Sequence, residues 1–275
     1  MAEIKFSKMI RGFDKVTIIT GGTRGIGEGC ARVFTRAGAP VVICEPDQAA
    51  GLAAARTISE EEKGNCRFIR CDVRNPEEIK DLIEKTVEMY GRLDCMINNA
   101  GWHPQHYTID NFSIQDLNDL LQLNLVSVFA GCKYALPYLR QTRGSIINTS
   151  SLVGQIGQEW AATYVTTKGG ITALTKALAV DEARNGVRIF AIAPGAIDTP
   201  LLRSFIQAAP NPQASLDAVE SYQWTGRIGT AEEVGEVCLF LASDSASFLN
   251  GIEVIVSGGA ELAYGNKLTK QGSAL

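Results

Sequence analysis

The chain has 275 residues, 45% of them hydrophobic and 20% charged, and its formal net charge is −4. This composition excludes a disordered chain, which would hold fewer apolar residues, and the length suffices for a core without disulfide or metal staples. The acidic balance argues against nucleic acid or an anionic membrane as a partner, because both call for a basic surface. Glycine is over-represented: 27 of the 275 residues are glycine, about 10%, whereas the average usage is about 7%.

Apolar strand-like runs alternate with amphipathic stretches along almost the whole chain. In chain order the predicted elements are a strand at Val16–Thr20, a helix at Gly27–Ala37, a strand at Val41–Cys44, a helix at Asp47–Lys63, a strand at Arg67–Arg70, a helix at Pro76–Tyr90, a strand at Cys95–Asn98, a helix at Ser113–Leu139, a strand at Ser145–Thr149, a helix at Ala161–Asn185, a strand at Arg188–Ala193, a helix at Ala231–Ser243 and a strand at Glu253–Val256. Such alternation builds βαβ units, and continuous apolar strands suit a sheet covered on both faces. We therefore predict one α/β domain over residues 1–275, with a doubly wound, parallel, seven-stranded sheet.

Three segments fall outside this pattern. Residues 200–229 are irregular and contain Pro210-Asn211-Pro212, so we interpret them as a loop insertion that serves the substrate. Residues 1–11 and 266–275 are expected to be flexible tails. The N-terminal stretch lacks the apolar core of a secretory signal, and no run reaches the ~18 apolar residues of a transmembrane helix.

Seven cysteines and two histidines bear on compartment and metal binding. The cysteines are odd in number and include no C-x-x-C pair, so we interpret them as reduced, buried thiols of a cytosolic protein. They are Cys30, Cys44, Cys66, Cys71, Cys95, Cys132 and Cys238. The histidines are His103 and His106. Because the sequence holds no ligand cluster with zinc-site spacing, we expect no metal.

A glycine-rich segment, Thr20–Gly27, joins the first strand to the first helix. Glycines in such a turn let the backbone approach a pyrophosphate, and the amides of the helix N-terminus point at the anion. A tight βα turn alone would use similar residues. The flanking strand and helix, with an acidic residue about twenty positions further on, favour a dinucleotide site.

That acidic residue is Glu45, at the end of the second strand. A carboxylate there accepts hydrogen bonds from the adenosine ribose and repels a 2′-phosphate, which favours NAD over NADP. Arg24 is a competing signal, because an arginine beside the ribose can pair with a 2′-phosphate. The alternative is that Arg24 only neutralises Glu45 or touches the ribose.

Two further strand ends carry candidate cofactor contacts. Asp72, followed by Val73, ends the third strand; an aspartate there can reach the adenine or can simply cap a helix or turn. Asn98-Asn99-Ala100-Gly101 ends the fourth strand. Small and amide residues there can border the cofactor, and one asparagine is expected instead to tie backbone together.

A candidate catalytic set follows the fifth strand. Tyr164 and Lys168 share a helix face, because residues four apart are neighbours. A phenol serves as base for an alcohol only if a nearby cation favours phenolate, and Lys168 supplies that charge. Ser151 can hydrogen-bond the substrate oxygen, and Asn124, a polar residue in an apolar helix, can anchor a water that relays the proton. Each residue alone also has a structural explanation; the combination predicts a dehydrogenase.

Together these residues resemble the short-chain dehydrogenase/reductase family. The family pattern T-G-x-x-x-G-x-G matches Thr20–Gly27, N-N-A-G matches Asn98–Gly101, and the catalytic tetrad falls on Asn124, Ser151, Tyr164 and Lys168. The resemblance runs from about residue 12 to 265 and implies a Rossmann fold. It also implies a cofactor site made of Gly21, Arg24, Gly25, Ile26, Gly27, Glu45, Asp72, Val73, Asn98, Ala100, Gly101, Tyr164, Lys168, Pro194, Gly195, Ile197, Thr199 and Leu201.

Within the family, stretches such as RLDCMINNAGWHP and SSLVGQIGQ are similar to members that oxidise 17β-hydroxysteroids or sugars such as L-fucose. This implies an NAD-dependent, cytosolic homotetramer that converts a secondary alcohol to a ketone. The substrate site would comprise His103, Ser151, Gln158, Tyr164 and Tyr264, the last reaching a neighbouring subunit. His103 and Gln158 could instead be a surface histidine and a helix-capping glutamine.

Three tryptophans, Trp102, Trp160 and Trp224, could wall an apolar pocket, or they could be rim or core aromatics. Two other functions stay open at this point: an NADP-dependent carbonyl reductase, and a nucleotide-binding scaffold without turnover. The intact set of Asn124, Ser151, Tyr164 and Lys168 argues against the scaffold.

Overall fold

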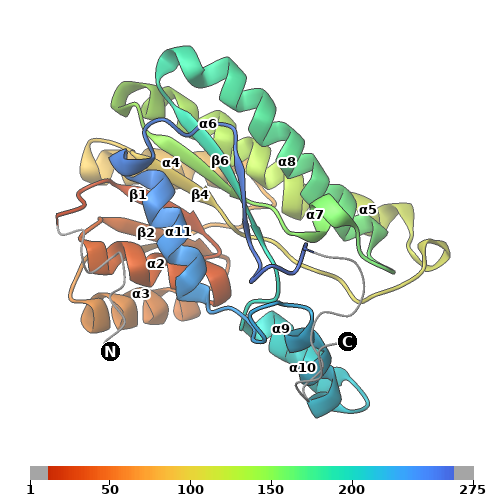
Figure 1. Ribbon diagram of the computed structural model, residues 1–275. Coiled ribbons are helices and arrows are strands. Elements are labelled where there is room, and N and C mark those ends of the chain that lie inside the picture. The colour runs from red at the N-terminus through yellow and green to blue at the C-terminus, as the bar shows by residue number, and fades with distance from the viewer. Residues whose placement is uncertain (1–11, 263–275) are drawn as a thin grey trace.

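Seven parallel strands form one sheet, in the order β3-β2-β1-β4-β5-β6-β7 (Figure 1). The computed structural model describes residues 12–262. The strands are β1 (Thr17–Thr20), β2 (Val41–Glu45), β3 (Cys66–Arg70), β4 (Cys95–Asn98), β5 (Ser145–Thr149), β6 (Arg188–Pro194) and β7 (Glu253–Val256). Each lies within one residue of its predicted bounds, which confirms the parallel α/β fold.

Helices cover both faces of the sheet (Figure 1). The α-helices of the described chain, whether or not they lie on the sheet, are α2 (Gly25–Ala37), α3 (Gln48–Glu62), α4 (Pro76–Tyr90), α5 (Ile114–Leu121), α6 (Ser127–Thr142), α7 (Val153–Ile156), α8 (Ala162–Glu182), α9 (Pro200–Ala208), α10 (Pro212–Ser221) and α11 (Ala231–Ala242). Helices α2, α3 and α11 pack on one face, and α4, α6 and α8 pack on the other. The chain therefore folds as a single, doubly wound Rossmann domain.

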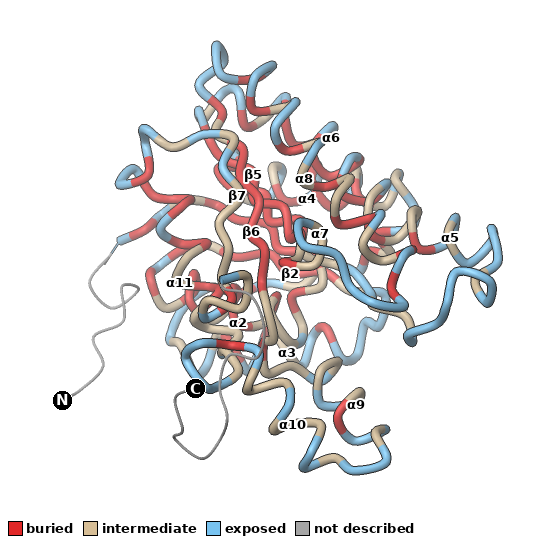
Figure 2. The backbone as a smooth tube through the Cα atoms, turned by 45° about the vertical axis from the view of Figure 1, so that its right-hand side comes forward, coloured by how far each residue is buried: buried red, intermediate tan, exposed pale blue. Residues whose placement is uncertain are grey.

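Successive strand residues point into two separate cores. On β1, Ile19 faces the core beneath α2 and α11, whereas Ile18 faces the core beneath α4 and α6. Alternation of this kind follows from the two-residue period of a strand. Because both faces are covered, the central strands are apolar throughout, and Figure 2 shows the sheet as the buried centre of the molecule.

Local signals define the helix ends. The side chain of Asn75 accepts a hydrogen bond from the Glu77 amide (3.1 Å) and Pro76 occupies the first helical position, so α4 begins where predicted. Gly91 ends it with a φ of 74°, a left-handed conformation that glycine adopts without strain.

Two predicted segments differ from the structure. The single helix predicted over Ser113–Leu139 is divided, because a π-helical turn at Gln122–Val126 separates α5 from α6. Residues 200–229 were predicted as irregular, yet they contain α9 and α10. Thr199 caps α9 and Asn211 caps α10, each with a proline at the first turn. Pro212, one of the two prolines that suggested a loop, thus begins a helix.

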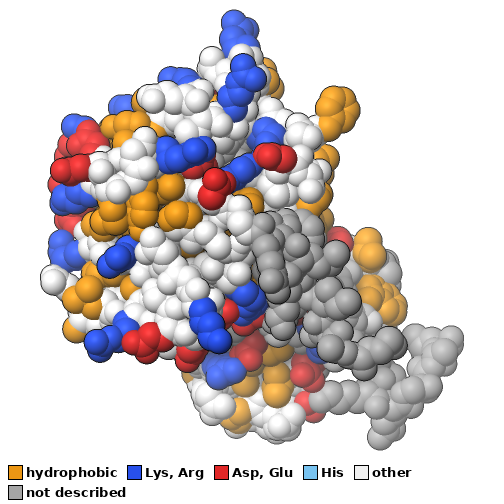
Figure 3. All heavy atoms as spheres, turned by 90° about the vertical axis from the view of Figure 1, so that its left-hand side faces the viewer, with side chains coloured by type: hydrophobic (Ala, Val, Ile, Leu, Met, Phe, Trp, Pro, Cys, Tyr) orange, Lys and Arg blue, Asp and Glu red, His pale blue; other side chains and the backbone are white. Residues whose placement is uncertain are grey.

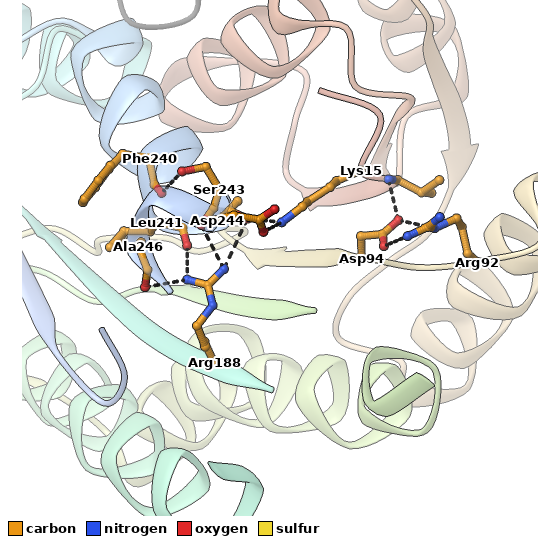
Figure 4. A network of polar contacts seen from close by, with 11 residues as sticks. Lys15, Arg92, Asp94, Arg188, Phe240, Leu241, Ser243, Asp244 and Ala246 are labelled. Carbon is orange, nitrogen blue, oxygen red and sulfur yellow. Dashed lines mark hydrogen bonds and ion pairs between the residues drawn. The ribbon is translucent and has the colours of Figure 1, made fainter. Parts of the chain in front are cut away.

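A polar network closes the edge of the sheet where the strands begin (Figure 4). The Arg188 guanidinium donates to the carbonyls of Leu241 (2.6 Å) and three nearby residues at the end of α11. Asp94 accepts from the Val16 amide (2.9 Å) and pairs with Arg92 (2.5 Å). These contacts satisfy helix and strand ends that would otherwise hold unpaired polar groups.

Acidic and basic side chains are interspersed on the face that Figure 3 presents. Within residues 12–262 no helix is long and apolar enough to cross a bilayer. The tails predicted at 1–11 and 266–275, and Tyr264, lie outside the described residues.

Candidate active site

The carboxyl ends of the parallel strands meet at one edge and bring the predicted residues together. The glycine turn follows β1, Glu45 ends β2, Asn98–Gly101 follows β4, Ser151 follows β5 and Pro194 ends β6. In an open parallel sheet, ligands bind at this edge, where the strand order reverses. Here the reversal lies between β1 and β4.

The turn after β1 fits a pyrophosphate. Gly25 begins α2 with a φ of +57°, and a Cβ on Gly27 would collide with the Gly21 carbonyl and lie 2.6 Å from the Asn99 side-chain nitrogen. Only glycine at Gly27 allows this close approach of backbone to backbone. The first amides of α2 therefore remain open to an anion. A cavity of about 390 Å³ lies beside this turn, lined by Gly25, Thr199 and Pro200 among others.

Glu45 lies next to the glycine turn, where the Thr23 hydroxyl donates to its carboxylate. Arg24 is exposed and precedes the first residue of α2. Within residues 12–262, no carboxylate lies within salt-bridge distance of the Arg24 guanidinium. A negative group thus lies beside the glycine turn, and the exposed Arg24 follows Thr23, which binds it.

The predicted adenine contact, Asp72, is engaged by a neighbour. Its carboxylate accepts from the Arg74 guanidinium (2.6 Å), which lowers the pKa of Asp72. Val73, next to it, is buried.

The two asparagines after β4 serve different purposes. The Asn98 amide is buried and donates to the Asn148 side chain (2.9 Å), so only the main chain of Asn98 is left to border a cofactor. The side-chain amide of Asn99 donates to the Thr20 carbonyl (3.0 Å). The Thr20 hydroxyl in turn accepts from the backbone N–H groups of Asn99 and Ala100. The Asn99 side chain thus ties backbone together, as expected of one of the two asparagines, whereas the Asn98 side chain joins β4 to the Asn148 side chain of β5.

Tyr164, Ser151 and Lys168 meet at the end of β5. The Ser151 side chain lies close enough to Tyr164 to lower the pKa of the phenol, which partly offsets the effect of burial. The Lys168 ammonium donates to the Thr149 carbonyl (2.7 Å) and lies 5.6 Å from the centre of the Tyr164 ring. Burial raises the pKa of Tyr164 to about 12 and lowers the pKa of Lys168 to about 8. Both shifts favour the neutral forms, as expected of groups withdrawn from water.

Asn124 lies in the π-helical turn, fully buried. Its side-chain oxygen accepts from the Trp102 amide (2.9 Å), and its nitrogen donates to the Trp102 carbonyl (2.9 Å) and to Thr167 (3.1 Å). A Cβ on Gly101 would lie 3.2 Å from this oxygen and 3.6 Å from the Lys168 nitrogen. A water between Asn124 and Lys168 would therefore have to use the remaining lone pair of the amide oxygen or the main-chain carbonyl.

His103 and Gln158 lie together at the front of the site. The His103 ring lies 4.0 Å from the Tyr164 ring, centre to centre, and its Nε2 is 3.1 Å from the Gln158 side-chain oxygen. Two further residues that the sequence did not indicate, His106 and Phe205, lie beside His103 and Gln158. His106 Nε2 lies 3.2 Å from the Gln158 nitrogen, and the His106 ring stacks on Phe205 of α9 at 5.8 Å. The only signal for His106 was its being the second histidine, three residues after the first.

The remaining predicted residues lie around the same edge. Gly195 approaches Ser257, Ile197 is buried, Thr199 caps α9 and Leu201 lies half-buried in its first turn. Trp102, Trp160 and Trp224 are all about half exposed, at 48%, 55% and 42%. They are rim residues and do not belong to the core.

The family of the chain follows from its similarity to known proteins. A family model described as enoyl-(acyl carrier protein) reductase matches residues 21–261. The chain belongs to the short-chain dehydrogenase/reductase family. It is therefore an oxidoreductase that uses a nicotinamide cofactor, NAD or NADP.

Relatives in this family include sugar dehydrogenases. L-fucose dehydrogenase of Bos taurus is 47% identical over 253 residues, which are 92% of either chain. Aldohexose dehydrogenase of Thermoplasma acidophilum is 30% identical, with a TM-score of 0.84 over 96% of this chain and 99% of that one. Actinorhodin polyketide ketoreductase, solved with NADPH, is 29% identical, with a TM-score of 0.85 over 90% and 97%.

Proposed function

We propose that the protein is an NAD-dependent dehydrogenase that oxidises a secondary hydroxyl of a sugar such as L-fucose to a ketone. The observation that carries this proposal is the meeting of Ser151, Tyr164 and Lys168 at the end of β5, beside a turn that fits a pyrophosphate. The 47% identity to an L-fucose dehydrogenase supports the substrate class.

The strand ends would hold the cofactor. The amides at the start of α2 would bind its pyrophosphate, and Glu45 would accept hydrogen bonds from the adenosine ribose. A carboxylate at Glu45 disfavours a 2′-phosphate, which supports NAD over NADP. The cofactor held there would supply the hydride acceptor for the oxidation.

The residues of the chain would then handle the proton of the substrate. Ser151 would hydrogen-bond the substrate oxygen and hold it against Tyr164, which accepts the hydroxyl proton. The phenolate needed for this step is costly in a buried site, because burial, only partly offset by the Ser151 side chain, raises the pKa of Tyr164 to about 12. The ammonium of Lys168 would offset that cost by placing a positive charge on the same helix face. Asn124 would hold the backbone of Trp102, and with it the adjoining Gly101, whose Cβ position lies 3.6 Å from the Lys168 nitrogen.

The substrate edge is polar and narrow on one side. His103 and Gln158 would contact further hydroxyls of the substrate, and Phe205 of α9 supplies an apolar wall beside them. This supports a role for residues 200–229 in substrate binding. A polar edge of this kind favours a sugar. A 17β-hydroxysteroid is the second candidate, supported by the exposed aromatic rings of Trp102 and Trp160.

The assembly and location belong to the same proposal. All seven cysteines are buried and free, as expected of a cytosolic protein. A cavity of about 260 Å³ between α6 and α8 is lined by Phe129, Leu136 and Leu178 among others, and Phe129 is 52% exposed. Such a surface supports a homo-oligomer, which we take to be a tetramer.

The test is a rate measurement with two cofactors and two substrate classes. NADH or NADPH formation is followed with L-fucose and with estradiol. We expect oxidation of L-fucose, with kcat/KM for NAD at least about tenfold above that for NADP, since one repelled charge amounts to a kcal/mol or more. If estradiol is oxidised and L-fucose is not, the proposed substrate is a 17β-hydroxysteroid and not a sugar. Tighter binding of NADPH than of NADH would overturn the role of Glu45 and favour a carbonyl reductase.

A further inference from the structure

Three separate chain segments meet on the side chain of His106. It lies after β4, contacts Gln158 in the segment after α7, and stacks on Phe205 of α9 with ring planes 10° apart. The His103 ring meets it edge-on at 5.0 Å. The next residue closes the same junction through the backbone, because the Tyr107 amide donates to the Trp160 carbonyl (2.9 Å). His106 is thus built into the wall of the substrate site, although it belongs to none of the predicted site residues.

The hydrogen-bond partners of His103 decide which way the Gln158 amide must point. His103 Nδ1 lies 2.6 Å from the Pro104 carbonyl, which only accepts, so Nδ1 carries a hydrogen. When the ring is neutral, its Nε2 then has no hydrogen and must accept. Only the amide nitrogen of Gln158 can donate to it. Oxygen and nitrogen of an amide exchange places by a half-turn, and the same heavy-atom frame serves both orientations.

His106 completes this arrangement from the other side. With the Gln158 nitrogen turned to His103, the Gln158 oxygen faces His106 Nε2, which must donate. The chain Pro104–His103–Gln158–His106 therefore has one self-consistent pattern when both rings are neutral. If His103 is instead protonated on both nitrogens, the amide turns over and His106 Nε2 becomes the acceptor. Burial and the neighbouring His103 lower the pKa of His106, which favours its neutral form.

We propose that His106 is a specificity-determining positioning residue, which holds the Gln158 amide in one orientation so that its free N–H and lone pair meet a hydroxyl next to the one that is oxidised. This inference rests on the proposed function, since it takes Tyr164 as the site of the reacting hydroxyl. The His103 ring lies 4.0 Å from the Tyr164 ring at a tilt of 40°, and its Nε2 is 3.1 Å from the Gln158 side chain, so only one side chain separates the Gln158 amide from the reacting position. The substrate class selected in this way is a vicinal diol or polyol, in preference to a lone secondary alcohol.

A matched pair of substrates and a pair of variants test the proposal. Cyclohexane-1,2-diol and cyclohexanol differ by one hydroxyl. His106→Phe keeps a ring on Phe205 and removes the nitrogens, whereas His106→Gln keeps a nitrogen near the position of Nε2. We expect the ratio of kcat/KM, diol over cyclohexanol, to fall about fivefold or more in His106→Phe, mainly through KM for the diol, and to recover in His106→Gln. An unchanged ratio, or an equal loss in both variants, would overturn the proposal.

A second measurement needs no turnover. The chain has only two histidines, so the imidazole ¹⁵N NMR spectrum of the whole protein contains two ring systems, and His106→Phe identifies them. At a pH about two units above the ordinary pKa of histidine, we expect His103 with its hydrogen on Nδ1 and His106 with its hydrogen on Nε2. Gln158→Leu should release His106 from that tautomer. The opposite tautomer of His106 in the unmodified protein would overturn the proposal.

The outcomes separate this inference from the proposed function. If L-fucose is not oxidised but the diol-to-cyclohexanol ratio still depends on His106, the sugar is wrong and the role of His106 stands. If no alcohol is oxidised, the tautomers alone decide whether His106 holds Gln158. If L-fucose is oxidised and the ratio does not depend on His106, the proposed function stands and this inference falls.

Discussion

Lys168 is the residue whose position is least explained by stability. It is 4% exposed, and its ammonium has one hydrogen bond, to a carbonyl. No carboxylate within residues 12–262 forms a salt bridge with it. A buried, unpaired cation destabilises a fold, so a lysine here favours the role proposed for it in the chemistry at Tyr164.

We predict that Lys168→Met raises the free energy of unfolding near neutral pH, by about 1–3 kcal/mol, while it abolishes oxidation. The folded-state pKa is about 8 against 10.5 for free lysine. The cost of burying the charge is therefore complete below about pH 8 and disappears as the pH rises to 10.5, because only the unfolded chain then holds the proton. Lost hydrogen bonding to Thr149 reduces the gain.

Urea denaturation at a series of pH values measures this effect. Tyr164→Phe is the matched control: it should lose activity to a similar degree without the pH-dependent gain in stability. A destabilised Lys168→Met protein at neutral pH would mean that Lys168 is satisfied by contacts other than the Thr149 carbonyl.

At the scale of elements, the turn between β1 and α2 decides whether a cofactor fits. The helix starts at Gly25 because glycine adopts its positive φ, and Gly27 lies in the first turn because no Cβ fits beside the Gly21 carbonyl. The same constraint leaves the first amides of α2 uncovered. A stable turn and an anion site are thus produced by the same two residues.

We predict that Gly27→Ala weakens NADH binding by about tenfold or more and lowers the free energy of unfolding by about 1–3 kcal/mol, because the added methyl group must push the turn open. Gly169→Ala in α8 is the control. A Cβ there meets nothing closer than the Gly154 carbonyl at 3.6 Å, so it should stabilise the helix by about 0.5–1 kcal/mol. Fluorescence titration with NADH and urea denaturation give both quantities. Equal NADH affinity in both variants would contradict the pyrophosphate site.

At the scale of the whole molecule, the two ends of the sheet have different tasks. The carboxyl edge carries the site, and the opposite edge carries the network of Figure 4, in which Arg188 joins β6 to the end of α11. Helix α11 also packs on α2, which bears the glycine turn. Arg188 therefore supports the cofactor edge from a distance.

We predict that Arg188→Met lowers the free energy of unfolding by about 2–3 kcal/mol, since it leaves several carbonyls at the end of α11 without a charged donor. Arg56→Met is the matched control. Its side chain is 80% exposed and its partner Glu60 lies 3.6 Å away, so the change should stay within about 0.5 kcal/mol. Similar losses in both variants, measured by urea denaturation, would show that the network at Arg188 contributes little.

The sequence by itself determined what depends on neighbours along the chain. Apolar runs and caps defined the strands within one residue, the glycines defined the turn after β1, and the four-residue spacing of Tyr164 and Lys168 placed both on one face of α8. These signals survive because helix and strand periods are local. The prolines of residues 200–229 misled, because proline both breaks helices and begins them, and only packing selects between the two.

Tertiary structure alone decided what comes from distant segments. The π-helical turn at Asn124 has no signature in the local sequence. The side chain of Asn98 points into the core because its hydrogen-bond acceptor, the Asn148 side chain, lies on the neighbouring strand β5. His106 could not be recognised from sequence, since its partners Gln158 and Phe205 lie on other segments and meet it only when the sheet brings their loops to one edge. Local sequence thus determines the fold and the candidate catalytic residues, whereas the wall of the candidate substrate site forms only when distant segments meet in the folded chain.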